Sequence, residues 1–526
     1  MKFFDFHCHP ILKQLFSDSP NIDSLIYKSD VAFLPKIMSD LPNIIESQIH
    51  QSQLAQLNEE VVVGAVLYSP ERYVAKAVIP LIPYLKASSR HKLSTTLLAK
   101  IENNQYKSFS DFLMKRSLQP FIDAKTSFNI LTKDSFKTGL PKNKVNVFFI
   151  IEGCHSLVDE NNFCDATHHY NPVSILKNLD KVLAKVNVLA VNITHLQQSS
   201  LCNHAFGMQI SDSTDFLPAG NGFENDGRKV VQGLFDRKIC VDVKHLSYKS
   251  RKDLMTEIDS GKFKSKQPLV CTHAGFTGTS FKNWPGFMQM KKPVSGAVYV
   301  KHTKPFDPEK MLTRPGSPTF NLSTINLFDE EIAWIVKNGG VIGISLDRRI
   351  LGYVDRFDEN PTGINSSSER IVDKEYFSKT EWAALGIKNQ DIGKLVDDDY
   401  CLTMTELEEC TEQSIPQRDE YFYDHFLNHL YHYFKVCKAS GMDLKKVQKQ
   451  ITVGSDYDGL INPFANISTV GRMSNLKSYV RMNFLYFLNS MEDSKKWSKE
   501  INMDAFIEDL FYNNGIAFIK SRFNQI

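Results

Sequence analysis

The sequence predicts an α/β fold, a (β/α)₈ barrel of the TIM type, and three observations support this prediction. Eight short apolar segments recur along the 526 residues. Segments with helical periodicity follow most of them, and near-continuous apolar strands that alternate with helices are typical of a parallel sheet buried on both faces. Seven of the eight segments end in a His, Glu or Asp, and six of these supply the candidate site residues, as expected where the functional groups of a barrel gather at the carboxyl ends of its strands.

The eight segments are bounded by polar residues and have the length of strands. The predicted strands are 3–9, 61–68, 145–152, 187–195, 238–245, 268–273, 340–347 and 451–456. Helical periodicity is clearest at 225–238 and at 328–340, and Gly339 and Gly340 are expected to end the second of these helices.

Three spacers between strands are much longer than a βα unit requires, so we expect insertions in them. The first, at about 85–140, is predicted to be helical, and the others, at about 275–325 and 350–415, are predicted to be irregular loops beside the site. We therefore expect one barrel domain over residues 1–526 with three insertions.

Composition and charge narrow the class of protein. The chain is 42% hydrophobic and 23% charged, with a formal net charge of +2, which is typical of a globular protein and gives no electrostatic basis for binding nucleic acid or an anionic membrane. Nine cysteines without a CxxC pair argue against a disulfide framework and against a cysteine-type zinc site. No signal peptide and no apolar run of membrane-spanning length is visible, so we expect a cytoplasmic protein without a membrane or nucleic-acid partner.

The opening stretch FDFHCHP, residues 4–10, places His7 and His9 two residues apart. Residues at this spacing in a strand point to the same side, so both imidazoles are expected to face one place at the end of the first strand. Five more candidates end other strands: Glu152, His195, His245, His273 and Asp456. Structural packing would explain any one of these residues, but the set favours a metal site at one rim of the barrel.

These residue types meet the needs of a binuclear hydrolytic site, in which imidazoles bind two metal ions, a carboxylate bridges them, and a water between them loses its proton near neutral pH. Glu152 is the natural bridge, because a carboxylate after five apolar residues would be expensive to bury unpaired. We expect His7 and His9 to bind one divalent ion and His245 and His273 to bind the other, with zinc as the first choice of metal.

The remaining two candidates have the chemistry of catalytic groups. Asp456 is expected to take the proton of the bridging water and deliver it to the leaving amine. His195 is then free to bind the substrate and polarise its scissile carbonyl.

Five motifs, in this order along the chain, resemble those of the renal (membrane) dipeptidase family, peptidase family M19 of the amidohydrolase superfamily: IEGCHSL, NITHL, VDVKHLS, LVCTHAG and GSDYDG. The resemblance spans the chain from the first strand to the eighth. It implies a metal-dependent dipeptidase that acts on a dipeptide or another small molecule, and we keep a homodimer open as its oligomeric state. In that family the Glu of the IEG-type motif bridges two zincs, which matches Glu152. The family's later metal-binding histidines match His245 and His273. Its substrate-binding histidine matches His195, and its acid/base Asp matches Asp456.

The sequence departs from the family pattern in two places. His7-Cys8-His9 stands where the family has His-x-Asp, which removes a negative charge from the first metal site, so we expect weaker occupancy or a different metal preference there. The family's Arg that binds the substrate carboxylate has no counterpart in SPTFNLSTI, residues 317–325. Arg314, Arg348 and Arg349 are candidates to replace it, and Arg348 is our choice as a substrate-binding residue.

Two alternative functions stay open. The first is another amidohydrolase chemistry, on a lactone, a cyclic amide or a phosphoester; FDFHCHP also resembles the opening of TatD-like deoxyribonucleases, although the later motifs fit those less well. The second is a barrel that binds metal without turnover.

Several other titratable residues are not assigned to the site. His425, His429 and His432 fall on one helical face of an aromatic run and are interpreted mainly as packing. Lys244 precedes His245, and strand alternation would turn its side chain away from the lumen if His245 faces inward, so a carbamylated-lysine bridge is rejected.

Overall fold

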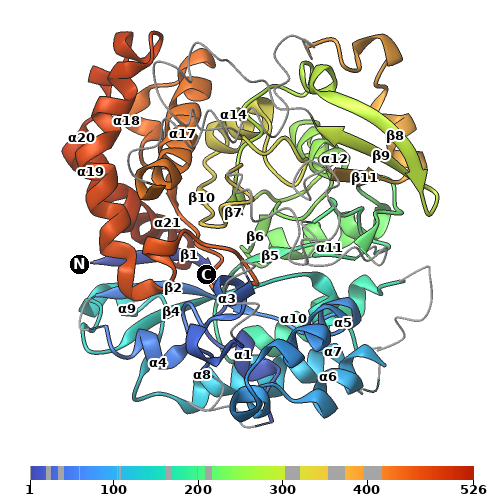
Figure 1. Ribbon diagram of the computed structural model, residues 1–526, viewed down its shortest axis with the longest axis vertical. Helices are drawn as coiled ribbons and strands as arrows, with labels where there is room; N and C mark the ends of the chain where they lie inside the picture. The colour runs from blue at the N-terminus through green and yellow to red at the C-terminus, as the bar shows by residue number, and fades with distance from the viewer. Residues whose placement is uncertain are drawn as a thin grey trace.

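The eight predicted strands form one parallel sheet at the centre of the molecule, and this arrangement confirms the predicted (β/α)₈ barrel (Figure 1). In their order around the sheet they are β1 (Phe3–Cys8), β2 (Val61–Leu67), β4 (Val145–Ile151), β5 (Val188–Asn192), β6 (Cys240–Asp242), β7 (Leu269–Ala274), β10 (Ile342–Ile344) and β12 (Ile451–Val453). The computed structural model describes residues 2–18, 25–32, 41–57, 60–103, 105, 108–159, 169–197, 199–207, 216–302, 320–352, 374–395 and 418–525.

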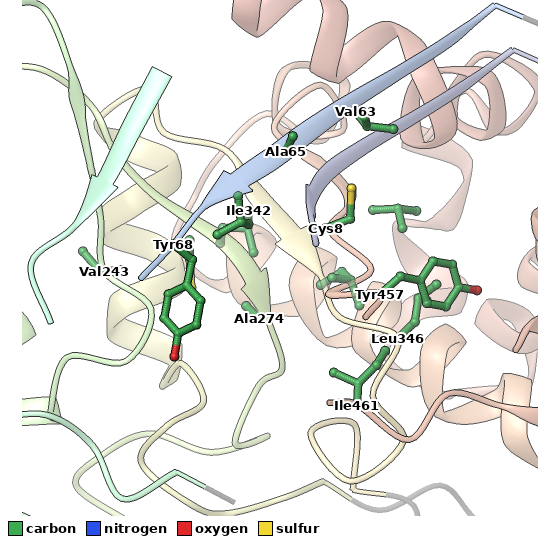
Figure 2. Packing of buried hydrophobic residues seen from close by; sticks show 14 of the residues in the cluster. Cys8, Val63, Ala65, Tyr68, Val243, Ala274, Ile342, Leu346, Tyr457 and Ile461 are labelled. Carbon is green, nitrogen blue, oxygen red and sulfur yellow. The ribbon is translucent and has the colours of Figure 1, made fainter. Parts of the chain in front are cut away.

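The sheet closes where β12 returns beside β1. Their carboxyl ends meet in a parallel bridge between Cys8 and Tyr457, and Figure 2 shows both side chains among the buried residues of this region. The amide of Asp456 donates to the carbonyl of His7 at 2.9 Å, and the amide of His9 donates to the carbonyl of Tyr457 at 2.9 Å. Three candidate site residues are therefore part of the closure itself.

Helices connect the strands and cover the outside of the sheet, with α17 to α20 gathered on one side of it (Figure 1). In chain order the helices are α1 (Leu12–Leu15), α3 (Leu41–Ile45), α4 (Gln51–Leu54), α5 (Arg72–Val78), α6 (Thr95–Glu102), α7 (Phe109–Phe112), α8 (Gln119–Asp123), α9 (Ser135–Thr138), α10 (Pro172–Leu183), α11 (Asn225–Asp236), α12 (Tyr248–Asp259), α14 (Asp329–Lys337), α15 (Lys379–Leu385), α17 (Arg418–Ala439), α18 (Leu444–Val447), α19 (Met473–Ser490), α20 (Met503–Glu508) and α21 (Asn514–Phe523). Helices α11 and α14 lie within the two ranges predicted from periodicity. In the described part of the chain, every helix is too short or too polar to cross a bilayer.

Aromatic side chains fill the amino-terminal end of the barrel. Phe4 stacks on Phe148 with ring centroids 5.7 Å apart, and Phe6 meets the ring of Phe518 from α21 at 6.0 Å. Gly515 allows α21 to come this close, because a Cβ there would lie 2.2 Å from the ring of Phe4. This end of the barrel is therefore filled, whereas the carboxyl-terminal end opens into a cavity lined by Glu152 and His245.

The first insertion is largely helical, as predicted. It contains α6, α7 and α8 and adds a short strand, β3 (Phe128–Ile130), which pairs in parallel with the start of β4.

The second insertion, predicted to be an irregular loop at about 275–325, contains regular strands instead. Strands β8 (Met288–Val294) and β9 (Ala297–His302) form an antiparallel hairpin, and β11 (Lys374–Phe377) from the third insertion adds a third strand. Only Met288 of the seven residues of β8 is buried, so no apolar run marks this strand in the sequence. Residues 303–319, 353–373 and 396–417 of the two insertions lie outside the described residues.

A buried carboxylate fixes the closure of the barrel. Asp5 accepts hydrogen bonds from the amide of Ser455 at 2.8 Å, from its hydroxyl, and from the amide of His7 at 3.2 Å. Because a buried donor left without a partner costs about 1–3 kcal/mol, we expect Asp5→Ala to lower the free energy of unfolding by about 3 kcal/mol in urea denaturation. Asp5→Asn retains an acceptor oxygen and should lose less; equal losses in the two variants would contradict this role.

Candidate metal centre

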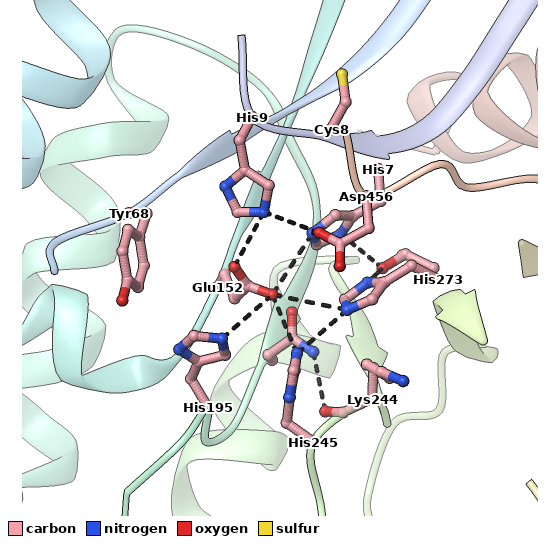
Figure 3. Close-up of polar contacts among 12 residues, drawn as sticks. His7, Cys8, His9, Tyr68, Glu152, His195, Lys244, His245, His273 and Asp456 are labelled. Carbon is pink, nitrogen blue, oxygen red and sulfur yellow. Dashed lines mark hydrogen bonds and ion pairs between the residues drawn. The ribbon is translucent and has the colours of Figure 1, made fainter. Parts of the chain in front are cut away.

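The polar strand ends predicted from the sequence meet at the carboxyl-terminal rim of the barrel (Figure 3). Glu152, directly after β4, lies at the centre. Its carboxylate oxygens are 3.2–3.9 Å from the Nε2 atoms of five histidines, which are His7, His9, His195, His245 and His273. The Oδ1 atom of Asp456 lies 3.2 Å from Nε2 of His9. Side chains separated by up to some 450 positions in sequence thus converge on one carboxylate.

Backbone conformation contributes to this convergence. His245 and Asp456 have φ angles of 68° and 61°, in the left-handed region that costs a non-glycine residue free energy and is enriched at functional sites. In β1, Cys8 points away from the imidazoles while His7 and His9 point toward them (Figure 3), as strand alternation predicts.

A second layer of side chains orients His7. The hydroxyl of Thr272 donates to the buried carboxylate of Asp242, and Nδ1 of His7 in turn donates to that hydroxyl at 2.8 Å. When His7 is neutral, its proton is on Nδ1 and its lone pair is on Nε2, which is buried and has no hydrogen-bond partner among the described residues. A histidine whose other nitrogen is fixed in this way is typical of a metal ligand.

The charge states of the cluster also suit a metal. Burial, together with the charge on His195, lowers the pKa of His245 to about 3, so this ring is neutral. Burial also lowers the pKa of His273 well below its usual range. Burial would raise the pKa of Glu152, but His195 and His7 outweigh it and hold this pKa well below its usual range. Neutral imidazoles beside an ionised carboxylate are the forms that bind a divalent ion.

Three groups of ligand atoms lie close enough to hold an ion, each with its atoms within 4.8 Å of one another. They are His7, His9 and Glu152; Glu152, His195 and His245; and His7, Asp242 and His273. The first is the predicted first metal site. Asp242 was not predicted, although it precedes the predicted ligand His245 by three residues.

Sequence reasoning also missed Glu71, which follows β2. Its buried Oε1 accepts a hydrogen bond from Nδ1 of His195 at 2.7 Å, and its other oxygen accepts one from the hydroxyl of Tyr68. Glu71 therefore directs Nε2 of His195 toward the cluster. A signal was present, because Glu71 is the only acidic residue between Val61 and Tyr84.

A cavity of about 960 Å³, counting the part that opens to solvent, lies over these residues. Its wall is otherwise mainly apolar and includes Leu12, Val74, Ala77, Leu196, Phe216, Ile325, Ile350, Leu460 and Ile461. The site can therefore take a small molecule with apolar groups and exclude most water from the reacting atoms.

The chain was also compared with known proteins. No protein-family model and no curated protein matches it. Among solved structures, it is similar to a metallo peptidase from Rhodobacter sphaeroides liganded with a phosphinate mimic of the dipeptide L-Ala-D-Ala, with a TM-score of 0.52 and 13% identity over 100% of this chain and 99% of that one. The two chains share a fold. The dipeptidase AC, a metallo peptidase of family M19, gives a TM-score of 0.48 at 13% identity over 99% and 98%. The probable dipeptidase PvdM from Pseudomonas aeruginosa gives 0.45 at 13% over 91% and 88%.

The arginines considered for substrate binding lie in different places. Arg348 is buried and does not line the cavity, whereas Arg349 does. Arg314 lies outside the described residues.

The prediction from strand alternation that the side chain of Lys244 turns away from the lumen is wrong. This side chain does not turn away but lines the same cavity as His245, because β6 ends at Asp242 and His245 has a left-handed backbone conformation. The regular alternation of a strand therefore does not extend to these two residues.

The histidines of α17 are packing residues. His429 Nδ1 donates to the carbonyl of His425 at 2.8 Å, and its ring stacks on Phe276 at 5.4 Å. His432 pairs with Asp329 at 2.7 Å. Their interpretation as packing agrees with these contacts.

The pair of Glu71 and His195 predicts a pH dependence of stability. Burial favours the neutral ring, but Glu71 and Glu152 together raise the pKa of His195 to about 9. Because this is above the value of about 6.5 in an unfolded chain, the protonated ring stabilises the folded protein fully below pH 6.5, and the stabilisation is lost as the pH rises through 9. We expect Glu71→Gln to cost on the order of 1–3 kcal/mol at pH 6.5 and less at pH 9.5, measured by urea denaturation of metal-free protein. A cost that does not change with pH would contradict this coupling.

Proposed function

We propose that this protein is a metal-dependent hydrolase that cleaves a small amide or peptide bond, with dipeptides as the first substrate class. The main support is the buried carboxylate of Glu152 with five imidazole nitrogens within 3.9 Å of it, below an apolar cavity. The ordered motifs and the shared fold with a metallo peptidase that binds a mimic of L-Ala-D-Ala support a peptide substrate.

The proposed ligands are those expected from the sequence. His7 and His9 would hold one divalent ion, His245 and His273 would hold the other, and the carboxylate of Glu152 would serve both; zinc is the proposed metal. When bound, two such ions supply an activated water and polarise the scissile carbonyl. The second layer of Thr272 and Asp242 keeps the ring of His7 in its ligating tautomer.

The residues of the chain then move protons and stabilise charge. Asp456 lies beside His9 and faces the cavity, so its carboxylate takes a proton from the attacking water and delivers it to the leaving nitrogen. His195, oriented by Glu71, donates a hydrogen bond from Nε2 to the carbonyl oxygen as negative charge develops there. The apolar wall strengthens both interactions because it excludes bulk water.

The proposed compartment is the cytoplasm. The six cysteines in the described residues are free and buried, and none forms a disulfide there. Free thiols of this kind suit a reducing compartment.

Removing the central carboxylate should remove the metal and the activity together. We expect elemental analysis to find two divalent ions per chain of reconstituted protein, and chelation to abolish dipeptide hydrolysis until metal is restored. Glu152→Gln should bind less metal and lose at least about 10³-fold in kcat/KM, whereas the exposed Glu492→Gln should match the wild type. Activity on a lactone or phosphoester panel with none on dipeptides would favour the alternative chemistry. Absence of bound metal after reconstitution would contradict the proposal.

A substitution of Asp456 can test proton transfer separately from metal binding. Asp456→Asn keeps the size of the side chain but cannot accept a proton, so we expect kcat to fall by about 10²- to 10⁴-fold with little change in KM or metal content. Steady-state kinetics with metal analysis of the same sample measures both. Loss of metal in step with kcat would assign Asp456 to binding instead.

A further inference from the structure

Two side chains of the Lys and Arg type line the cavity, Lys244 and Arg349. The protein itself compensates the charge of Arg349, because its guanidinium donates to the two oxygens of Asp347 at 3.0 and 2.8 Å and to the carbonyl of Leu460 at 3.0 Å. Arg349 therefore already has a counter-ion before any ligand enters.

Lys244 has no comparable partner. Its side chain is 2% exposed, and its Nζ donates to the carbonyl of Ile325 at 3.5 Å, the outer limit of a hydrogen bond. Within the part of the chain that the structure describes, no carboxylate oxygen lies within the 4.0 Å of an ion pair with this ammonium. Asp456 and Asp242 are the acidic groups that influence it from farther away, and Arg251 opposes them.

A buried ammonium without a counter-ion is expensive, because the low dielectric of the interior does not replace the water that it loses. An apolar side chain would fill this part of the wall at a lower cost. A cation retained under these conditions in a cavity wall indicates that an anion from the ligand completes the ion pair.

We propose that Lys244 is a specificity-determining residue that binds a carboxylate of the substrate. This inference rests on the proposed function. A carboxylate suits the site better than a phosphate dianion, because one ammonium neutralises one charge and Arg349 is already paired with Asp347.

The position of Lys244 also limits where the carboxylate lies in the substrate. Lys244 precedes the proposed ligand His245, and the two side chains line the same cavity. Because both side chains line one cavity of small-molecule size, the group that Lys244 binds is expected within a few bonds of the scissile amide. An unblocked dipeptide or an N-acyl amino acid meets this condition, whereas a peptide with an amidated end does not.

The test compares L-Ala-L-Ala with L-Ala-L-alaninamide, which differ in that charge alone. In the metal-loaded protein we expect the wild type to prefer the acid. The Lys244→Met variant should lose about 10- to 100-fold in kcat/KM for the acid, as for a lost hydrogen bond between charged groups. The kcat/KM of this variant for the amide should stay within about threefold of the wild-type value. Lys244→Arg should recover most of the preference. Lys337→Met, at an exposed position on α14, is the matched control and should leave both substrates unchanged.

Equal losses of Lys244→Met on the two substrates, or a wild type with no preference for the acid, would overturn the proposal, and the second result needs no variant to fold. If the wild type hydrolyses neither substrate, the proposed function fails, and calorimetric titration with N-acetyl-L-alanine and N-acetyl-L-alaninamide decides the role of Lys244 separately. Binding of the acid at least tenfold tighter in the wild type and not in Lys244→Met supports the proposal. Equal affinities overturn it.

Discussion

The placement of one ionised carboxylate inside the barrel is the constraint on which the rest of the site depends. Glu152 follows the apolar run of β4 and is 2% exposed, so its charge must be compensated by the protein or by what the protein binds. The five imidazoles around it do so only in part, because burial keeps His245 and His273 neutral. A cation bound between Glu152 and these neutral rings would compensate the charge of the carboxylate and use the free lone pairs of the imidazoles. The fold can therefore be understood as a scaffold that brings six strand ends to this point.

The residues that close the barrel between β12 and β1 also belong to the candidate site. The amide of Asp456 bonds to the carbonyl of His7 across the seam, so the proposed acid/base group cannot move independently of a proposed ligand. The left-handed conformations of His245 and Asp456 are held by backbone hydrogen bonds, because the amide of Ala205 donates to the carbonyl of His245 and the amide of Asp456 donates to the carbonyl of His7. Strain and closure together hold the site in place with little adjustment needed when a ligand enters.

The parts of this structure that the sequence predicted are those encoded by local pattern. Apolar runs marked the eight strands, and the polar residues at the ends of six of these runs marked the candidate site, because parallel strands in a barrel end at one rim. Glu71 and Thr272 were missed, since their partners, His195 and His7, are distant in sequence and no periodicity connects them. The hairpin of β8 and β9 was missed because most of β8 is exposed and carries no apolar signal. Lys244 was misplaced because alternation was extended past the last residue of β6.

The departure at His9 and the unpaired Lys244 have the same electrostatic consequence. With His9 in place of an acidic residue, the two divalent ions that we propose would bring more positive charge than Glu152 and Asp456 neutralise, and an ammonium at Lys244 in the cavity wall would add to the excess. In an apolar cavity this potential is screened little by solvent. Under this proposal, anions would enter the cavity more favourably than neutral molecules, and the same positive potential would favour hydroxide over water at the site. A histidine in place of an acidic ligand would thus weaken the binding of the first ion and strengthen the attraction for a negatively charged substrate.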